Sequence, residues 1–171
     1  MQSHFDLFGL ETRYALQTEA LDQAYREIQT RVHPDRYAQA GDAERRASLQ
    51  LTTRVNEAYR TLKDPVQRAR HILELQSVDV GFETNTQMPS EFLLKQLELR
   101  EELEGAVQAR NADRLDAIRQ KLSLDGKAIQ AEIGNLIDKQ KNYAAAVEPV
   151  RKLMFLSRLD AEIDEAYEEI A

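Results

Sequence analysis

The tripeptide His33-Pro34-Asp35 combines three residue types that favour a binding contact. Proline fixes the backbone φ angle and has no N–H donor, so the side chains beside it lose little entropy when a partner binds. The carboxylate of Asp35 can accept two hydrogen bonds from one arginine. The tripeptide alone leaves two interpretations open. Either Pro34 simply ends a helix and Asp35 is solvated, or the three residues form a contact site.

Arginines lie on both sides of this tripeptide. Arg26 and Arg31 precede it, outside the apolar stripe of their segment, and Arg36 follows Asp35 directly. A basic surface of this kind speeds the encounter with an acidic partner. The arginines therefore favour the contact-site interpretation, with an acidic protein surface as the partner.

The sequence offers little for catalysis or metal binding. The histidines His4, His33 and His71 are scattered, and the chain has no cysteine, which excludes disulfides, thiolate zinc sites and iron–sulfur ligation. There is no glycine loop that could hold a phosphate, and nothing points to a Ser-His-Asp triad, whose members would meet only in space. We expect no catalytic residue, no metal and no cofactor. A small helical enzyme is an alternative that catalytic turnover by the protein alone would support.

Composition predicts an all-α protein, because Ala, Leu, Glu, Gln and Arg are abundant and tryptophan is absent. No apolar run approaches the ~20 residues that span a bilayer, and the N-terminus does not resemble a signal peptide, so we expect a cytoplasmic protein without membrane contact. The net charge of −7 argues against nucleic-acid binding. Residues 1–76 carry equal numbers of basic and acidic residues, so the excess negative charge lies in residues 77–171. This asymmetry indicates two domains with different partners.

The first domain, residues 1–76, is predicted to be helical. Short helix 5–8 is followed by a helix at 19–32 with Thr18 as N-cap. A long helix comes next, with Asp42 as its candidate N-cap, and continues to about residue 62, where Lys63-Asp64-Pro65 ends it. A last helix closes the domain. The two longer helices can pack as an antiparallel hairpin with loop 33–42 at its tip. The core candidates of the long helix are Leu49, Val55, Ala58, Tyr59 and Leu62.

Residues 77–90 have no helical period and contain Gly81, Asn85 and Pro89, so we expect a linker there. The second domain, residues 91–171, is predicted to be a three-helix bundle, with helices at about 90–108, 111–138 and 143–170. Pro149 disagrees with the last of these ranges. It either kinks that helix or lies in the first turn of a helix that begins later.

The helix around residues 92–105 has more leucines than one buried face can hold. At 100° per residue, Phe92, Leu99 and Leu103 form one stripe, whereas Leu93 and Leu97 lie on another side of the helix. Leu94 lies near this second side, together with acidic residues. The second set either packs on another part of the protein or forms an exposed protein-binding surface, since an exposed apolar patch usually binds a partner. Phe155, at the edge of the apolar stripe of its own helix, could extend such a surface.

The first domain resembles a J-domain, the module of DnaJ-type proteins that stimulates a chaperone ATPase. The resemblance rests on Asp6-Leu7-Phe8-Gly9-Leu10, on the arginine-bearing helix, on His33-Pro34-Asp35 and on the Asn56-Glu57-Ala58-Tyr59 stretch, in that order. It implies that His33, Pro34 and Asp35 engage the ATP-bound form of a DnaK-type chaperone and trigger hydrolysis. It also implies that Arg26, Arg31 and Arg36 dock on the negative surface of that chaperone.

The second domain extends the resemblance to nearly the whole chain. The stretches QLELREELE at 96–104 and VRKLMFLSRLDAEI at 150–163 are similar to the HscB family, the J-type co-chaperones of iron–sulfur cluster biogenesis. Membership would imply that the bundle binds the scaffold protein IscU and delivers it to the chaperone HscA. The implied scaffold-binding residues are Leu93, Leu94, Leu97, Glu98, Arg100, Glu101 and Phe155. Gly105 departs from the family pattern, which has an acidic residue there.

The resemblance leaves one rival within the J-domain class, a general chaperone that holds unfolded clients. The sequence lacks the Gly/Phe-rich linker and the cysteine-rich zinc region expected of such a protein. Suppression of the aggregation of arbitrary unfolded proteins would favour that alternative.

Overall fold

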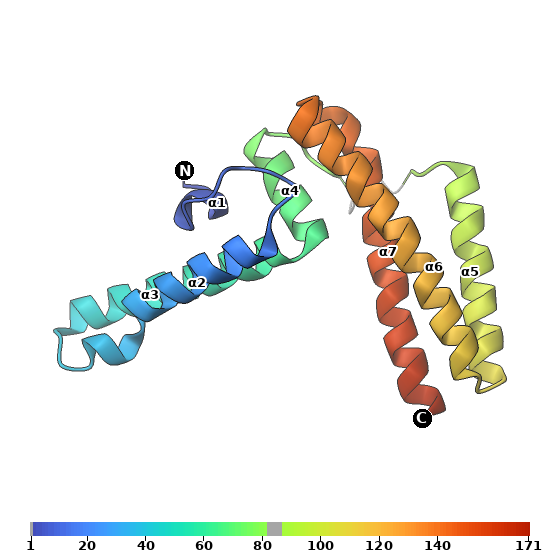
Figure 1. Ribbon diagram of the computed structural model, residues 1–171, viewed down its shortest axis with the longest axis horizontal. Coiled ribbons are helices and arrows are strands. Elements are labelled where there is room, and N and C mark those ends of the chain that lie inside the picture. The colour runs from blue at the N-terminus through green and yellow to red at the C-terminus, as the bar shows by residue number, and fades with distance from the viewer. Residues whose placement is uncertain (1, 82–86) are drawn as a thin grey trace. The chain divides into compact units, whose positions relative to one another are not determined.

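The computed structural model describes residues 2–81 and 87–171, and every regular element in these ranges is a helix (Figure 1). The predicted all-α class is therefore confirmed. The chain divides into two compact units, Met1–Ser77 and Val78–Ala171, and each is described by itself. The predicted linker at 77–90 includes residues 82–86, which lie outside the described residues.

The first unit begins with the short helix α1 (His4–Leu7), which is closed by a reciprocal cap. The Ser3 hydroxyl accepts a hydrogen bond from the Asp6 N–H at 3.0 Å, and the Asp6 carboxylate accepts one from the Ser3 N–H at 2.9 Å. Gly9 then adopts a φ of +64°, a left-handed conformation that glycine reaches without steric cost. The chain can therefore turn sharply behind the buried ring of Phe5.

Helices α2 (Thr18–Val32) and α3 (Asp42–Lys63) lie side by side and run antiparallel, as the hairpin predicted from their apolar spacing (Figure 1). Their apolar faces meet each other because the buried positions recur at intervals of three and four residues. The hairpin residues with at most 1% exposure are Leu21, Val55, Ala58 and Leu62.

A row of polar contacts runs along the same hairpin. The Tyr25 hydroxyl donates to the Asn56 side-chain oxygen at 2.6 Å, and the Tyr25 ring stacks on Tyr59 with 4.0 Å between centroids. The Tyr59 hydroxyl and the Lys63 ammonium each donate to one Asp22 oxygen at 2.7 Å. These bonds, first from Lys63 and then from Tyr59, lower the pKa of Asp22. Because such pairs have defined partners, they fix the register of α2 against α3.

Helix α4 (Pro65–Leu75) begins where α3 was predicted to stop. The Asp64 carboxylate caps it by accepting hydrogen bonds from the N–H groups of Val66 and Gln67, at 2.8 and 3.0 Å. Pro65 occupies the first helical position, where a missing N–H costs nothing. The predicted break at Lys63-Asp64-Pro65 is therefore confirmed.

Two details predicted for this unit are wrong. Leu49 is not a core residue, because it is 54% exposed. Its neighbour Ser48 is the buried one, and successive residues of a helix point about 100° apart. The N-cap positions of α2 and α3 are Gln17 and Gly41, each one residue earlier than predicted, and neither makes a side-chain capping bond.

His71 of α4 packs against α1. Its ring stacks on the His4 ring with 4.2 Å between centroids, and its Nε2 accepts a hydrogen bond from the His4 backbone N–H at 3.1 Å. Burial and, second, the nearby His4 lower the pKa of His71 from 6.5 to about 4. A protonated ring could not accept that hydrogen bond, so the folded unit holds His71 neutral.

We expect the first unit to lose stability as the pH falls from about 6.5 towards 4, because there the unfolded chain protonates His71 and the folded chain does not. The full pKa shift corresponds to roughly 3 kcal/mol, and partial exposure of the ring reduces the expected loss to about 1–2 kcal/mol. Urea denaturation at about pH 7.5 and pH 5, followed by circular dichroism, measures the loss.

The variant for this measurement is His71→Gln, which removes the titrating group and should flatten the pH dependence. Equal pH dependence in wild type and His71→Gln would contradict the prediction.

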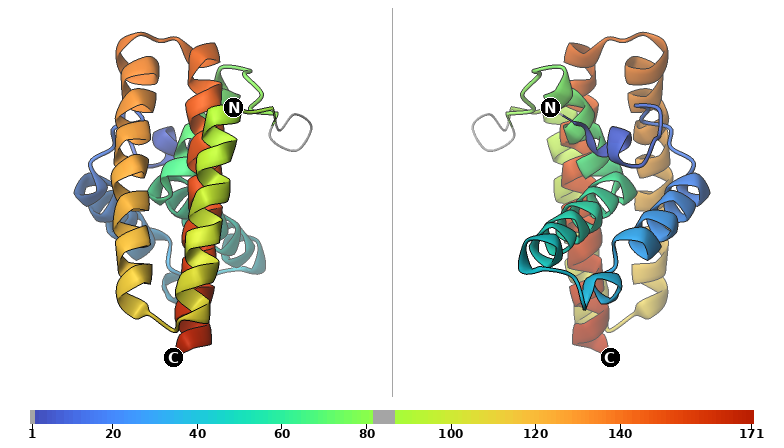
Figure 2. Two further views of the ribbon diagram at one scale, coloured as in Figure 1. Left: turned by 90° about the vertical axis from the view of Figure 1, so that its right-hand side faces the viewer. Right: turned by 90° about the vertical axis from the view of Figure 1, so that its left-hand side faces the viewer.

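The second unit contains three long helices, α5 (Ser90–Gln108), α6 (Ala112–Gly134) and α7 (Tyr143–Ile170). Helix α6 continues into a π-helical turn, η2 (Asn135–Lys139). Figure 2 shows the three helices side by side, and the three predicted helices agree with these bounds to within a few residues. None of the helices in the described ranges is both long and apolar enough to cross a membrane.

Asparagines begin the second and third helices of this bundle. The side-chain oxygens of Asn111 and Asn142 each accept a hydrogen bond from a backbone N–H in the first turn, at 3.1 and 3.3 Å. The residues just before them, Arg110 and Lys141, have φ angles of +49° and +53°. Left-handed residues at these two places reverse the chain within a few positions, so consecutive helices can lie antiparallel.

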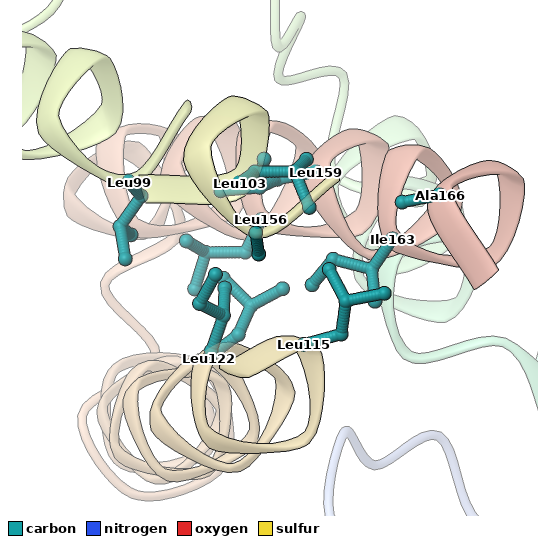
Figure 3. Close-up of a cluster of buried hydrophobic side chains, with 10 residues drawn as sticks. Leu99, Leu103, Leu115, Leu122, Leu156, Leu159, Ile163 and Ala166 are labelled. Carbon is teal, nitrogen blue, oxygen red and sulfur yellow. The ribbon is translucent and has the colours of Figure 1, made fainter. Parts of the chain in front are cut away.

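The core of the bundle lies along the line where α5, α6 and α7 face each other (Figure 3). Each helix contributes aliphatic side chains at helical spacing, so all three are needed to close the core. The buried members are Leu99, Leu103, Ala106, Leu115, Ile118, Leu122, Leu156, Leu159, Ile163 and Ala166.

Polar groups join α6 and α7 at the rim of this core. The Arg119 guanidinium donates to Asp160 at 3.2 Å and also to Asp164, which raises the pKa of Arg119. The Tyr167 hydroxyl donates to the Asp116 carboxylate. These contacts extend the packing of α6 on α7 to the bundle surface.

Pro149 lies inside α7, which begins six residues earlier, at Tyr143. The alternative in which the last helix starts near Pro149 is therefore wrong. The ring of Pro149 is buried in the bundle, and this apolar packing offsets the loss of one backbone donor.

Candidate functional site

The loop at the tip of the α2–α3 hairpin contains His33-Pro34-Asp35 and continues as a 3-10 turn, η1 (Pro34–Tyr37). His33 begins this turn, because its Nδ1 accepts a hydrogen bond from the Asp35 N–H at 3.2 Å. The side chains of His33 and Asp35 remain 50% and 92% exposed. The loop therefore presents both side chains to solvent in a locally fixed geometry.

The base of this loop is held by two hydroxyls of α3. The Ser48 hydroxyl donates to the Val32 carbonyl at 2.7 Å, and the Thr52 hydroxyl shares its one hydrogen between the Ser48 carbonyl at 2.8 Å and the Val32 carbonyl at 3.2 Å. In a continuing α-helix that carbonyl would accept from Arg36, but the Arg36 N–H bonds to the His33 carbonyl instead. Sequence reasoning missed Ser48 and Thr52. Their signal is weak: two hydroxyl residues four positions apart on the face of α3 that meets the end of α2.

The three arginines predicted to dock on an acidic surface lie on α2 and in η1. Arg26, Arg31 and Arg36 are exposed, and none of them forms an ion pair with another described residue. Their guanidinium groups are therefore available to an external partner. Arg26 and Arg31 lie on α2, which leads into the exposed loop, and Arg36 lies in η1, within that loop.

The leucine-rich helix α5 has an apolar exposed side. Leu93, Leu94 and Leu97 are 41%, 57% and 55% exposed, although large aliphatic side chains are usually buried. The alternative in which Leu93 and Leu97 pack on another helix of the bundle is therefore wrong. We use "leucine surface" for these three residues with their predicted companions, namely Glu98, Arg100, Glu101 and Phe155.

Phe155 of α7 lies next to the start of α5. Its ring meets the Phe92 ring edge-on, at 5.8 Å between centroids and an interplanar angle of 77°. Phe155 is partly buried, so one side of its ring packs and the other reaches the surface. The fold thus brings an aromatic residue to the helix that carries the leucines, more than fifty positions away in sequence.

Arg100 is already paired within the bundle. Its guanidinium forms two hydrogen bonds, each 3.3 Å long, with the carboxylate of Glu162 on α7. Sequence reasoning did not identify Glu162, because a single sequence does not indicate which acid of a distant helix faces a given arginine. The pair fixes the orientation of Arg100 at the edge of the leucine surface.

Gly105, which departs from the family pattern, lies near Arg114 of α6. A Cβ added at Gly105 would lie 3.1 Å from Arg114 Nη2. The position where an acidic residue was expected is therefore bordered by a cation in this chain.

No group of three His, Asp or Glu side chains in residues 2–81 and 87–171 lies close enough together to hold a metal ion. The exposed features of these ranges are instead a polar loop and an apolar surface, which are suited to contacts with other proteins.

Comparison with known proteins shows to which family a chain with this loop and this leucine surface belongs. The DnaJ domain model matches residues 3–71, and the model of the HSCB C-terminal oligomerisation domain matches residues 88–164. The chain is 49% identical over 168 residues to the co-chaperone protein HscB homolog of Burkholderia multivorans, covering 98% of this chain and 95% of that one. The homolog of Burkholderia vietnamiensis is 51% identical over 169 residues, with the same coverage. The chain belongs to the HscB family of co-chaperones.

A solved HscB structure supports the same conclusion. The chaperone HscB from Vibrio cholerae superimposes with a TM-score of 0.85 at 32% identity, covering 99% of both chains. In this HscB-family chain, the exposed loop lies in the part matched by the DnaJ domain, and the whole leucine surface lies in the part matched by the HscB C-terminal domain.

Proposed function

We propose that this HscB-family protein stimulates ATP hydrolysis by the DnaK-type chaperone HscA and delivers to it the iron–sulfur scaffold protein IscU. In this proposal the protein works in the cytoplasm, without a cofactor, and catalyses no reaction itself. The single observation that carries the proposal is that the J-type loop and a separate apolar surface are both exposed, one in each unit.

The first unit would contact the chaperone through its loop. Asp35 presents a carboxylate that an arginine of the chaperone can bind bidentately, and Pro34 and the Asp35–His33 hydrogen bond restrict the loop before binding. The arginines of α2 and η1 (Arg26, Arg31 and Arg36) would steer the unit towards a negative surface on the ATPase.

The second unit would hold the scaffold on the leucine surface. Burying three exposed leucines and the exposed part of Phe155 removes apolar area from water, at about 25 cal/mol per Å². Glu98 and Glu101 lie beside the leucines on the exposed side of α5 and can pair with basic residues at the rim of the contact. Arg100 would take part while held by Glu162.

A physical link between the two units makes delivery efficient. Once the scaffold is bound to one unit, its concentration near a chaperone bound to the other is set by the connecting chain rather than by the bulk solution. The co-chaperone therefore raises the rate at which the chaperone meets this one client.

The direct test is a reconstituted ATPase assay with purified HscA, IscU and this protein. We expect the protein alone to raise ATP turnover, and the protein with scaffold to raise it more than the sum of the separate effects. A scaffold-capture assay on the immobilised protein is run in parallel. Absence of both stimulation and capture would contradict the proposal, whereas protection of arbitrary unfolded proteins from aggregation would favour a general chaperone.

A further inference from the structure

A cavity of about 400 Å³ opens between α5 and α6, with residues of α7 contributing to its lining. Its apolar wall is formed by Phe92 and Leu99 of α5, Ile129 of α6 and Leu156 of α7. This volume lies in the range of cavities that bind small ligands or inserted side chains. We call this cavity the α5–α6 groove.

Gln96 lines this groove and has an unusual environment. Its side chain is only 4% exposed, yet its Oε1 accepts no hydrogen bond from any residue of the described ranges. A buried amide oxygen without a donor is unfavourable, and natural proteins rarely keep one. A hydrogen-bond donor entering the groove would remove this defect.

The groove also carries charged side chains of both signs, and one of its lysines, Lys152, is paired with Glu148 at 3.5 Å. Lys95, Lys121 and Lys152 line it together with the acids Glu98 and Asp125, whereas residues 77–171 as a whole carry a net charge of −7. Lys95 and Lys121 form no ion pair with any described residue. The groove therefore offers unpaired ammonium groups beside an apolar wall, which suits a carboxylate attached to an apolar group.

The α5–α6 groove is continuous with the leucine surface. Phe92 lines the groove and also meets the ring of Phe155, and Glu98 belongs to both. On the other side, Leu124 of α6 is 64% exposed and lies on the helix face that carries Lys121. A partner bound to the leucine surface would therefore also cover the groove if its contact extended around α5 to the side that faces α6.

We propose that the α5–α6 groove receives a segment of the scaffold protein bound to the leucine surface. The segment carries an apolar side chain, a donor for Gln96 and a carboxylate for Lys121 and Lys95. This inference rests on the proposed function, and the groove adds a second anchor that makes binding selective for that segment.

The test measures scaffold affinity by calorimetry with the full-length protein and purified IscU. Ala128→Trp fills the groove, and Lys121→Glu reverses its charge, because both residues line it. The matched controls are Ala131→Trp and Lys127→Glu, exposed positions on the same helix that do not line the groove. We expect each groove variant to weaken binding at least about fivefold, and each control to stay within about twofold of wild type.

The Leu97→Ala variant separates this inference from the proposed function. If Leu97→Ala weakens scaffold binding and both groove variants bind like wild type, the groove inference is overturned and the proposed function stands. If Leu97→Ala and the groove variants all bind like wild type, the leucine surface is not the scaffold site, and both fail. Weakening by the controls as well would also overturn the inference, because it would place the effect outside the groove.

Gln96→Met distinguishes a binding role from a packing role. Methionine keeps the length of the side chain and removes the unpaired oxygen, so we expect a melting temperature equal to or above that of wild type together with weaker scaffold binding. A purely structural role for Gln96 would leave the affinity unchanged, and that result would contradict the assigned hydrogen bond.

Discussion

Replacing Asp35 with alanine is expected to abolish stimulation of the chaperone ATPase and to leave scaffold binding intact. The Asp35 side chain is 92% exposed, and its interactions within the chain are with the neighbouring His33, so its loss removes an external contact rather than a structural one. A hydrogen-bonded charge pair at an interface is expensive to break, because the arginine of the partner stays unpaired. We expect the stimulated rate to fall at least about tenfold, to the basal rate, in a steady-state ATPase assay.

Glu44→Ala is the matched control for this variant, because Glu44 is an exposed acid in the first turn of α3 and forms no ion pair with a described residue. It should retain full stimulation. Scaffold capture by Asp35→Ala should equal that of wild type, since the leucine surface lies in the other unit. Loss of both activities in Asp35→Ala would show that the two contacts are not separable and would refute the assignment.

Truncating the leucine surface produces the second large effect. Leu97→Ala and Phe155→Ala are each expected to weaken scaffold affinity by about 1–2 kcal/mol, and the Leu93/Leu97 double alanine variant by more than either single change. The exposed leucines form few contacts within the bundle, so for the leucine variants this loss should appear in the dissociation rate and not in the melting temperature. Phe155→Ala also removes the packing on Phe92 and should lower the melting temperature as well. Surface-based kinetics with IscU, combined with thermal denaturation, measures both quantities.

The control for the leucine variants is Leu75→Ala, which removes a leucine of comparable exposure, 38%, from the first unit. Its scaffold affinity should be unchanged. Stimulation of the chaperone in the absence of scaffold should remain normal for the leucine-surface variants. Unchanged affinity in both Leu97→Ala and Phe155→Ala would remove the leucine surface as the scaffold site.

Local signals in the sequence predicted most of the helical architecture. Apolar residues at intervals of three and four predicted the helices, and Asp64-Pro65 predicted the break between α3 and α4. Helix formation and helix termination could both be predicted because each depends on residues that are neighbours in the chain. The error at Leu49 has a tertiary cause. In the same helix turn, Ser48 faces α2 in place of Leu49. The hydrogen bond from the Ser48 hydroxyl to the Val32 carbonyl makes burial of that hydroxyl favourable.

The candidate site could be predicted only in part, because some of its contacts join residues of different helices. The angular distribution of apolar residues around one helix placed Leu93 and Leu97 outside the stripe that faces the bundle, but it left open whether they pack or are exposed. The Arg100–Glu162 pair and the cavity beside Gln96 depend on which residues of different helices meet. Periodicity gives the face of each helix but not its partner across the bundle, so these features required coordinates.

The bundle core, shown in Figure 3, draws all its side chains from the second half of the chain, and the hairpin has a core of its own. Amino-acid changes that repack one core therefore need no compensating change in the other. During divergence, the specificity for the ATPase and the specificity for the cargo can drift at different rates. A lineage that acquires a new cargo can alter α5 while it inherits the older trigger loop unchanged.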